Sequence, residues 1–363
     1  MSKDLRFKRL STYRVGGNED RLQLAMPTPM SPSGKTYQYS PNPDAPPRLF
    51  LLGDADPLEA RTTPRRPMRR RPGPGQTVCP YSGVMSDDED FTHFDDLRVI
   101  KKHIQRLVEA DIEDHLADMA RDFNRRQPRD ALISLKMDVP RRARSQTHRP
   151  LAIRQDLMRN VDCTLCGRHY AVYAIALYCP DCGAPNLLRH FDRELSLIDA
   201  QITLAESDSR ELDKELAYRL LGNAHEDVLT AFEAALKVAF RQLAAMHFEH
   251  GAEPPSPPTP NAFQNIRKGS AAYRATGVEL FACLDESELS ALSDHVQRRH
   301  VIGHNLGVAD DLFTKLTDSG RIGQTVSIVA DDIRAFGKLC RRVIEQVEQT
   351  LAWDEVEFED VVT

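Results

Sequence analysis

Four cysteines in two CxxC pairs constrain the fold of this chain more than any other feature of its sequence. They stand in the stretch CTLCGRHYAVYAIALYCPDCG, at Cys163, Cys166, Cys179 and Cys182, and a glycine follows each pair. Zinc takes four such ligands in a tetrahedron, and glycine allows the tight turn that wraps a chain around the ion. Because the protein fills all four positions, water has no access to the ion. The pattern therefore predicts one structural zinc per chain.

The segment between the pairs, GRHYAVYAIALY, is rich in β-branched and aromatic residues, which favours a short β-hairpin. With its two cysteine pairs the stretch resembles a zinc ribbon, and ribbons often bind nucleic acid or protein. A redox function is disfavoured, because no βαβ pattern surrounds the pairs. Flanking arginines offer phosphate contacts, although a run of arginines is also typical of a solvated face; they are Arg141, Arg142, Arg144, Arg149, Arg154, Arg159 and Arg168.

A degenerate second knuckle is one interpretation of the upstream stretch VCPYSGV. In it Ser82 stands where a second cysteine would follow Cys79, and Ser40 and Ala45 would occupy the other half of the site. The alternative is that Cys79 is simply a small buried apolar residue. Both interpretations predict no second zinc.

Composition limits where a nucleic acid could bind and where the protein resides. The 363 residues carry a net charge of -6, so a site for a polyanion must be a local patch. No apolar run approaches the roughly 18 residues of a membrane helix, and the N-terminal MSKDLRFKRL lacks the apolar core of a signal peptide. We therefore expect a cytoplasmic protein without a membrane segment, whose seven cysteines are metal ligands and free thiols.

The first half of the chain is expected to hold one long helix and little other regular structure. Residues 1–90 are rich in proline, glycine and arginine and contain only short strand-like pieces such as RLFLLG. In residues 91–160 a long amphipathic helix is followed by ALISLKMDV, which alternates like a strand, and by the basic connector PRRARSQTHRP. The apolar stripe of this helix needs a partner to cover it; it consists of Leu97, Ile100, Ile104, Leu107, Val108, Ile112, Leu116, Met119 and Phe123.

After the ribbon at residues 161–186 the pattern is helical almost to the end of the chain. Residues 187–221 predict a linking helix, residues 222–352 predict a compact bundle, and residues 353–363 are an acidic tail. The expected fold class is mainly α, with a helical C-terminal bundle, a central ribbon with short hairpins and an irregular N-terminal region. The first bundle helix would begin at an Asn223 cap and bury the stripe Val228, Leu229, Phe232, Leu236, Ala239 and Leu243.

One helix end in this bundle carries a cluster of basic side chains. The stretch RRHVIGHN contains Arg298, Arg299, His300, His304 and Asn305. Its order of arginine, polar residue, short apolar step and histidine resembles the motif of HEPN (higher eukaryote and prokaryote nucleotide-binding) domains. The continuation NLGVADD resembles the one that many bacterial members carry. The resemblance covers roughly the last third of the chain.

The resemblance implies a metal-independent endoribonuclease that cuts RNA by attack of a 2′-OH. His304 would be the general base or acid, Arg299 would stabilise charge on the phosphoryl oxygens, and His300 would assist. Because HEPN motifs pair across a two-fold axis, the resemblance also implies a homodimer through the C-terminal bundle. The expected setting is a bacterial toxin or phage-defence system, with a protein partner such as an antitoxin.

The same residues allow a second interpretation. His300 and His304 could cap helix carbonyls, and HEPN-like bundles also occur as silent interaction domains. The chain would then be a non-enzymatic adaptor that binds nucleic acid or protein. Three histidines without such grouping, His115, His225 and His250, are expected at the surface. A P-loop or Rossmann enzyme is disfavoured, since neither GxxxxGK[ST] nor GxGxxG occurs.

Overall fold

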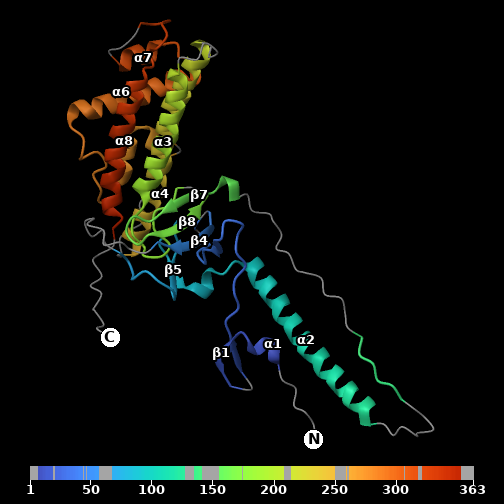
Figure 1. Ribbon diagram of the computed structural model, residues 1–363. Coiled ribbons are helices and arrows are strands. Elements are labelled where there is room, and N and C mark those ends of the chain that lie inside the picture. The colour runs from blue at the N-terminus through green and yellow to red at the C-terminus, as the bar shows by residue number, and fades with distance from the viewer. Residues whose placement is uncertain are drawn as a thin grey trace. The chain divides into compact units, whose positions relative to one another are not determined.

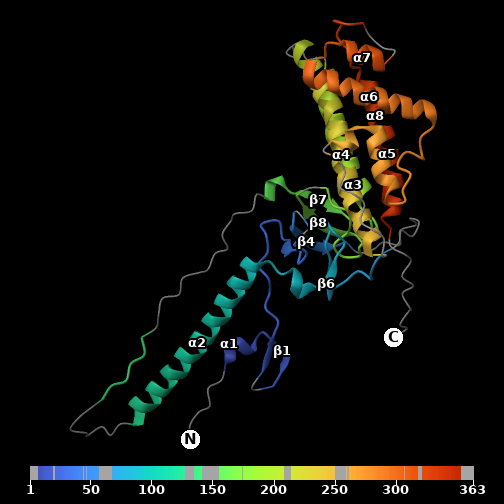
Figure 2. The ribbon, with the colours of Figure 1, turned by 180° about the vertical axis from the view of Figure 1, so that it is seen from behind.

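In the computed structural model the chain forms two compact units (Figure 1, Figure 2). The first unit comprises Met1–Tyr39 and Glu89–Leu157, and the second comprises Ser40–Asp88 and Met158–Thr363. The expected N-terminal region therefore contributes to both units. The structure describes residues 7–18, 21–43, 45, 47–56, 68–126, 135–140, 155–173, 175–207, 214–249, 259, 261–305, 307–317 and 321–352.

The first unit is built around α2 (Phe94–Arg126), the long helix that the apolar periodicity predicts. Asp95 and Asp96 lie in its first turn and two arginines in its last, which suits the helix dipole. The other elements of this unit are short. They are α1 (Lys8–Ser11), the antiparallel pair β1 (Arg14–Gly17) and β2 (Leu22–Leu24), β3 (Thr36–Tyr39), η1 (Asp88–Phe91) and η2 (Gln155–Leu157).

A buried carboxylate fixes α1 against α2. The backbone N–H groups of Arg9 and Leu10 donate to the carboxylate of Asp111, at 3.0 Å to Oδ2 from Arg9 and 3.3 Å from Leu10. The side chain of Leu10 is buried, and the Arg9 guanidinium also pairs with Asp114. One side of α2 is therefore covered by its own unit.

The strand expected at residues 131–139 is not found in its described part. Residues 131–134 lie outside the described residues, and 135–140 form no strand. Instead the side-chain amide of Asn124 bonds both the N–H and the carbonyl of Met137, at 2.9 and 2.8 Å. Alternating side chains alone do not make a strand, because a strand also needs a neighbour to pair with its backbone. The basic connector lies almost wholly outside the described residues.

The second unit contains an antiparallel sheet in which β8 (Arg168–Val172) lies between β4 (Leu49–Ala55) and β7 (Arg159–Asp162). Phe50 pairs with Val172, and both are fully buried. This pairing differs from the expected hairpin between the two cysteine pairs. The strand after the first pair joins the strand before it, because the cysteine turn itself forms the hairpin connection. A separate hairpin joins β5 (Gln76–Val78) to β6 (Met85–Asp87).

The helices of the second unit share one apolar core. In both views α3, α4 and α8 run beside one another (Figure 1, Figure 2). The predicted buried stripe from Val228 to Leu243 lies in this core, which confirms the expected face of α4. The helices are α3 (Leu187–Glu206), α4 (Lys214–Glu249), η3 (Ala262–Gln264), α5 (Ile266–Arg274), α6 (Glu286–Asn305), α7 (Asp311–Leu316) and α8 (Ala330–Thr350).

Two expected helix boundaries differ from the observed ones. Asn223 does not cap a helix, because α4 begins at Lys214 and runs through it with the Asn223 side chain exposed. The segment 187–221 is not a linker either, since α3 buries Phe191, Ile198 and other residues in the common core. Apolar residues recur through both segments at helical spacing, so the helices extend further than a cap signal suggests. The acidic tail 353–363 lies outside the described residues.

Candidate metal centre and helix-end site

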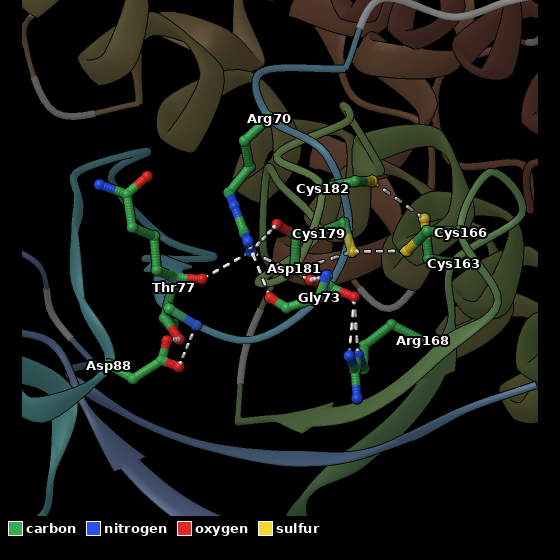
Figure 3. A network of polar contacts seen from close by, with 12 residues as sticks. Arg70, Gly73, Thr77, Asp88, Cys163, Cys166, Arg168, Cys179, Asp181 and Cys182 are labelled. Carbon is green, nitrogen blue, oxygen red and sulfur yellow. Dashed lines mark hydrogen bonds and ion pairs between the residues drawn. The ribbon is translucent and has the colours of Figure 1, made fainter. Parts of the chain in front are cut away.

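Two turns of the second unit bring the four predicted cysteines together (Figure 3). The sulfur atoms of Cys163 and Cys182 lie 3.8 Å apart, and those of Cys166 and Cys179 lie 3.5 Å apart. All four sulfurs lie within 4.8 Å of one another, and all four side chains are buried. In the part of the chain that the structure describes, this is the one cluster of at least three His, Cys, Asp or Glu side chains able to hold a metal ion.

The spacing of the sulfurs fits a tetrahedral ion. A zinc–sulfur bond of about 2.3 Å gives a tetrahedron whose edges are about 3.8 Å. The three other thiols, Cys166 first, lower the pKa of Cys163, whereas burial raises the pKa of Cys179. Four buried thiols cannot all ionise without a cation to balance them. A divalent soft ion bound by all four would meet both the geometry and the charge.

The two cysteine turns have the same backbone geometry. Gly167 N donates to Cys163 O at 2.9 Å, and Gly183 N donates to Cys179 O at 3.0 Å. Both glycines have positive φ, at 73° and 70°. A Cβ at Gly167 would lie 2.9 Å from the backbone oxygen of Asp56, so a side chain there would be both strained and crowded. These contacts explain why a glycine follows each pair in the sequence.

A buried aspartate in the second turn ties this turn to the first (Figure 3). Asp181 Oδ2 accepts from Arg168 Nε at 2.9 Å, and its Oδ1 accepts from Arg70 Nη1 at 3.1 Å and from Gly73 N at 2.9 Å. The Asp181 side chain is 2% exposed. The sequence pattern alone does not predict this network, although Asp181 lies inside the CPDCG stretch. Arg168 is thus occupied within the protein and is not an open phosphate contact.

Of the other arginines flanking the cysteines, only Arg159 lies among the described residues. Its guanidinium pairs with Glu194 on α3. Arg141, Arg142, Arg144, Arg149 and Arg154 lie outside the described residues. The described part of the chain therefore lends no support to a basic phosphate-binding face around the cysteine cluster.

The turn at Cys79 has the geometry of a third cysteine turn. Gly83 N donates to Cys79 O at 2.9 Å, and Cys79 N donates to Val84 O at 2.7 Å, as in the two turns of the cysteine cluster. Ser82 occupies the place of a second cysteine, and its Oγ has no hydrogen-bond partner among the described residues. The expected other half does not repeat the pattern, because Ser40 N donates to Arg48 O. Cys79 is fully buried, which agrees with both interpretations of this residue.

The expected nuclease residues lie on the last turns of α6, which continues through Asn305. Arg298 forms an ion pair with Asp332 at 3.5 Å, and its Nε has no hydrogen-bond partner among the described residues. Arg299 is half-buried and His300 is exposed. His304 lies one helical turn after His300 along the backbone, and its side chain, like that of Asn305, lies outside what the structure describes.

A pocket of about 200 Å³ opens beside Arg298. Its lining includes Arg298, Gln324, Thr325 and Ser327, whose side chains carry a guanidinium, an amide and two hydroxyls. These groups can all donate hydrogen bonds to an anion. The rest of the lining consists of Ala309, Phe313 and Val326.

A glycine shapes the turn that follows α6. Gly307 has φ of 80°, and its N–H donates to Val301 O at 3.1 Å, which closes the helix end. A Cβ at this position would lie 2.2 Å from Tyr218 Oη. Gly307 is therefore required for the chain to leave the helix in this direction.

Two histidines, one on α4 and one on α6, form a buried pair. His225 Nε2 lies 3.1 Å from His295 Nδ1, and the His295 ring stacks on Phe336 at 4.5 Å between centroids. Burial first, and then the charge of Arg298, lowers the pKa of His295 to about 4. The expectation that His225 lies at the surface is wrong, because its side chain is 2% exposed. Its spacing to Val228 and Leu229 on the buried stripe of α4 was the signal that could have placed it.

The expected surface position of His115 is only partly met, since its side chain on α2 is half-buried, and His250 lies outside the described residues. No described helix is long and apolar enough to cross a membrane. No family model, no curated protein and no solved structure matches the chain.

Proposed function

We propose that the second unit is a metal-independent endoribonuclease of the HEPN kind, with its site at the end of α6. In this proposal Arg299 stabilises negative charge on the phosphoryl oxygens, and His304 transfers the proton of the attacking 2′-OH or of the leaving 5′-oxygen. His300, one turn before His304, assists. The four cysteines hold a structural zinc and take no part in the chemistry.

The observation that carries the proposal is the pocket beside Arg298, which is the one residue of the motif in its described lining. It lies at the same helix end as the arginine and histidine motif, and its guanidinium, amide and hydroxyl groups suit a phosphate of the RNA backbone. A homodimer that pairs two such helix ends would supply groups from both chains.

A non-catalytic adaptor is the second candidate, and one contact favours it. Asp332 already balances part of the charge on Arg298, which weakens the attraction for an RNA phosphate. In this alternative the cysteine cluster and the helical unit bind nucleic acid or a partner protein without cutting RNA. Tight, salt-sensitive RNA binding without cleavage, and overexpression without growth arrest, would support it.

The decisive comparison uses the purified full-length protein and structured RNA in the presence of EDTA. We expect cleavage by the parent protein, and a loss of about a hundredfold or more in rate for Arg299→Ala and for His304→Ala. Arg219→Ala, which removes an exposed arginine on α4, is the matched control and should cut like the parent. Melting temperatures should stay close to that of the parent in all three variants. Equal cleavage by parent and both site variants would refute the proposal.

A further inference from the structure

The arginine that lines the pocket at the end of α6 already has an acidic partner. Arg298 is the one charged residue in the described lining of this pocket. Its side chain is 25% exposed, and its Nη1 lies 3.5 Å from Oδ2 of Asp332. Asp332 is not among the described lining residues. An anion bound in the pocket would therefore share the Arg298 guanidinium with a carboxylate of the same chain.

The packing of α8 sets the position of this carboxylate. Residues 324–327 belong to the pocket lining, and the chain continues from them through two residues into α8, which carries Asp332 in its first turn. Ala330 and Ile333 in the same turn are both buried. Because partly exposed ion pairs contribute little to stability, these buried contacts, more than the ion pair, keep Asp332 beside Arg298.

The preceding residue is also an aspartate, but its partners differ. Asp331 Oδ1 lies 3.3 Å from Nη1 of Arg334, and the Asp331 side chain is 89% exposed. Arg334 also pairs with Asp199 and Glu206 on α3. None of these residues belongs to the described lining of the pocket. The first turn of α8 thus holds two neighbouring aspartates, of which one pairs with the pocket arginine and the other with a separate network.

The histidines close to Arg298 do not change this balance of charge. Burial is the first cause that lowers the pKa of His225 and of His295, and the charge of Arg298 is a further cause for both. Both side chains are therefore neutral near pH 7. Among the described residues, Asp332 is the acidic side chain that forms an ion pair with Arg298. Because Arg298 is largely shielded from water, one neighbouring charge has more effect on it than it would in bulk solvent.

We propose that Asp332 lowers the affinity of this site for RNA, because its carboxylate competes with an RNA phosphate for the Arg298 guanidinium. A phosphate that binds Arg298 replaces one anionic partner by another, and the two anions repel each other while both are near. The contact is therefore autoinhibitory. This inference rests on the pocket as the RNA site of the proposed function, but it does not require that the RNA is cut.

Removal of the carboxylate charge in the full-length protein tests the competition. The probe is a structured RNA whose 2′-OH groups are all replaced by fluorine, so that attack by a 2′-OH cannot cut it. We expect Asp332→Asn to lower the dissociation constant, measured at low salt in EDTA, by about fivefold or more. Asp331→Asn is the matched control. It removes the same charge one residue earlier and should change the dissociation constant by less than about twofold, because its partner is Arg334.

A double variant shows whether the effect acts through the guanidinium. In a protein that also carries Arg298→Gln, Asp332→Asn should lower the dissociation constant no more than Asp331→Asn does. The reason is that the cation for which the carboxylate competes is then absent. Circular dichroism should show that the variants are folded like the parent.

Three outcomes would overturn the proposal. Weaker RNA binding by Asp332→Asn would mean that the carboxylate orients Arg298 for the RNA. Equal gains for Asp332→Asn and Asp331→Asn would mean that only net charge matters. The third outcome is that neither the parent nor Asp332→Asn binds the probe.

The same variants keep this proposal distinct from the nuclease proposal. If natural RNA is cut by the parent while Asp332→Asn binds the probe no more tightly, the competition is refuted and the nuclease stands. If Asp332→Asn binds the probe more tightly and natural RNA is not cut, the competition is supported and the nuclease is refuted.

Discussion

At the scale of single residues, buried histidines determine how the second unit responds to acid. Burial lowers the pKa of His190 and His225 to about 3 and that of His295 to about 4. The unfolded chain takes up protons at these groups near pH 6.5, whereas the folded chain does so only at much lower pH. The contribution to stability is therefore fully present above about pH 6.5 and is lost as the pH falls towards 4 and then 3.

Replacing one of these histidines should weaken the dependence of the free energy of unfolding on pH. Between about pH 6.5 and 4, one such histidine changes the free energy of unfolding by up to about 1.4 kcal/mol per pH unit. We expect His295→Asn to reduce the slope by about this amount, measured by urea unfolding at several pH values in that window. His115→Asn on α2 serves as the control. If His295→Asn and the parent have the same slope, folding does not lower the pKa of His295, which would contradict the prediction.

The cysteine cluster yields a prediction about metal content. The parent protein should contain one zinc per chain by elemental analysis, because the four sulfurs lie within 4.8 Å of one another and four thiolates suit a tetrahedral zinc. Cys163→Ser should lose the metal and destabilise the second unit, since binding energy at such a site is folding energy. Cys79→Ser should keep the metal. No zinc in the parent, two per chain, or a stable zinc-bound Cys163→Ser would contradict this assignment.

At the scale of elements, two asparagines at apparent helix starts differ, because one caps a helix and the other does not. Asn265 caps α5, because its side chain accepts from Lys268 N at 3.0 Å, whereas Asn223 is exposed inside α4. Asn265→Ala should lower the free energy of unfolding by about 1 kcal/mol. Asn223→Ala should raise it slightly, by a few tenths of a kcal/mol, because alanine favours the helix interior. Chemical denaturation of both variants measures these changes. If Asn223→Ala lowers the free energy of unfolding as much as Asn265→Ala does, a helix begins at Asn223.

Periodicity predicts elements well where the helix is long. The stripes of α2 and α4 are visible in the sequence because an apolar face repeats over many turns. Helix ends are harder to predict, since in the sequence an asparagine that caps a helix looks the same as an exposed one in the helix interior. The expected strand at residues 131–139 shows the same difficulty, because alternation describes side chains and carries no information about a backbone partner.

At the scale of the whole molecule, the chain interleaves its two units. Ser40–Asp88 joins the second unit, and β4 pairs with β8 more than one hundred residues later. No local pattern contains such a pairing, which is why the N-terminal 90 residues looked irregular in the sequence. The four cysteines were predictable because their spacing is local and their chemistry is specific. Asp181 and His295 were not, since their roles depend on residues brought near by the fold.

The chemistry of the cleaved RNA ends tests the proposed function most directly. Attack by a 2′-OH leaves a cyclic phosphate or a 3′-phosphate on the 5′ fragment, and it cannot occur where the ribose lacks that hydroxyl. We therefore expect mass spectrometry of the products to show these ends, and an RNA with a 2′-deoxy sugar at the cut position to stay intact there. Products with a 3′-OH, or cleavage at the deoxy position, would contradict the mechanism assigned to Arg299 and His304.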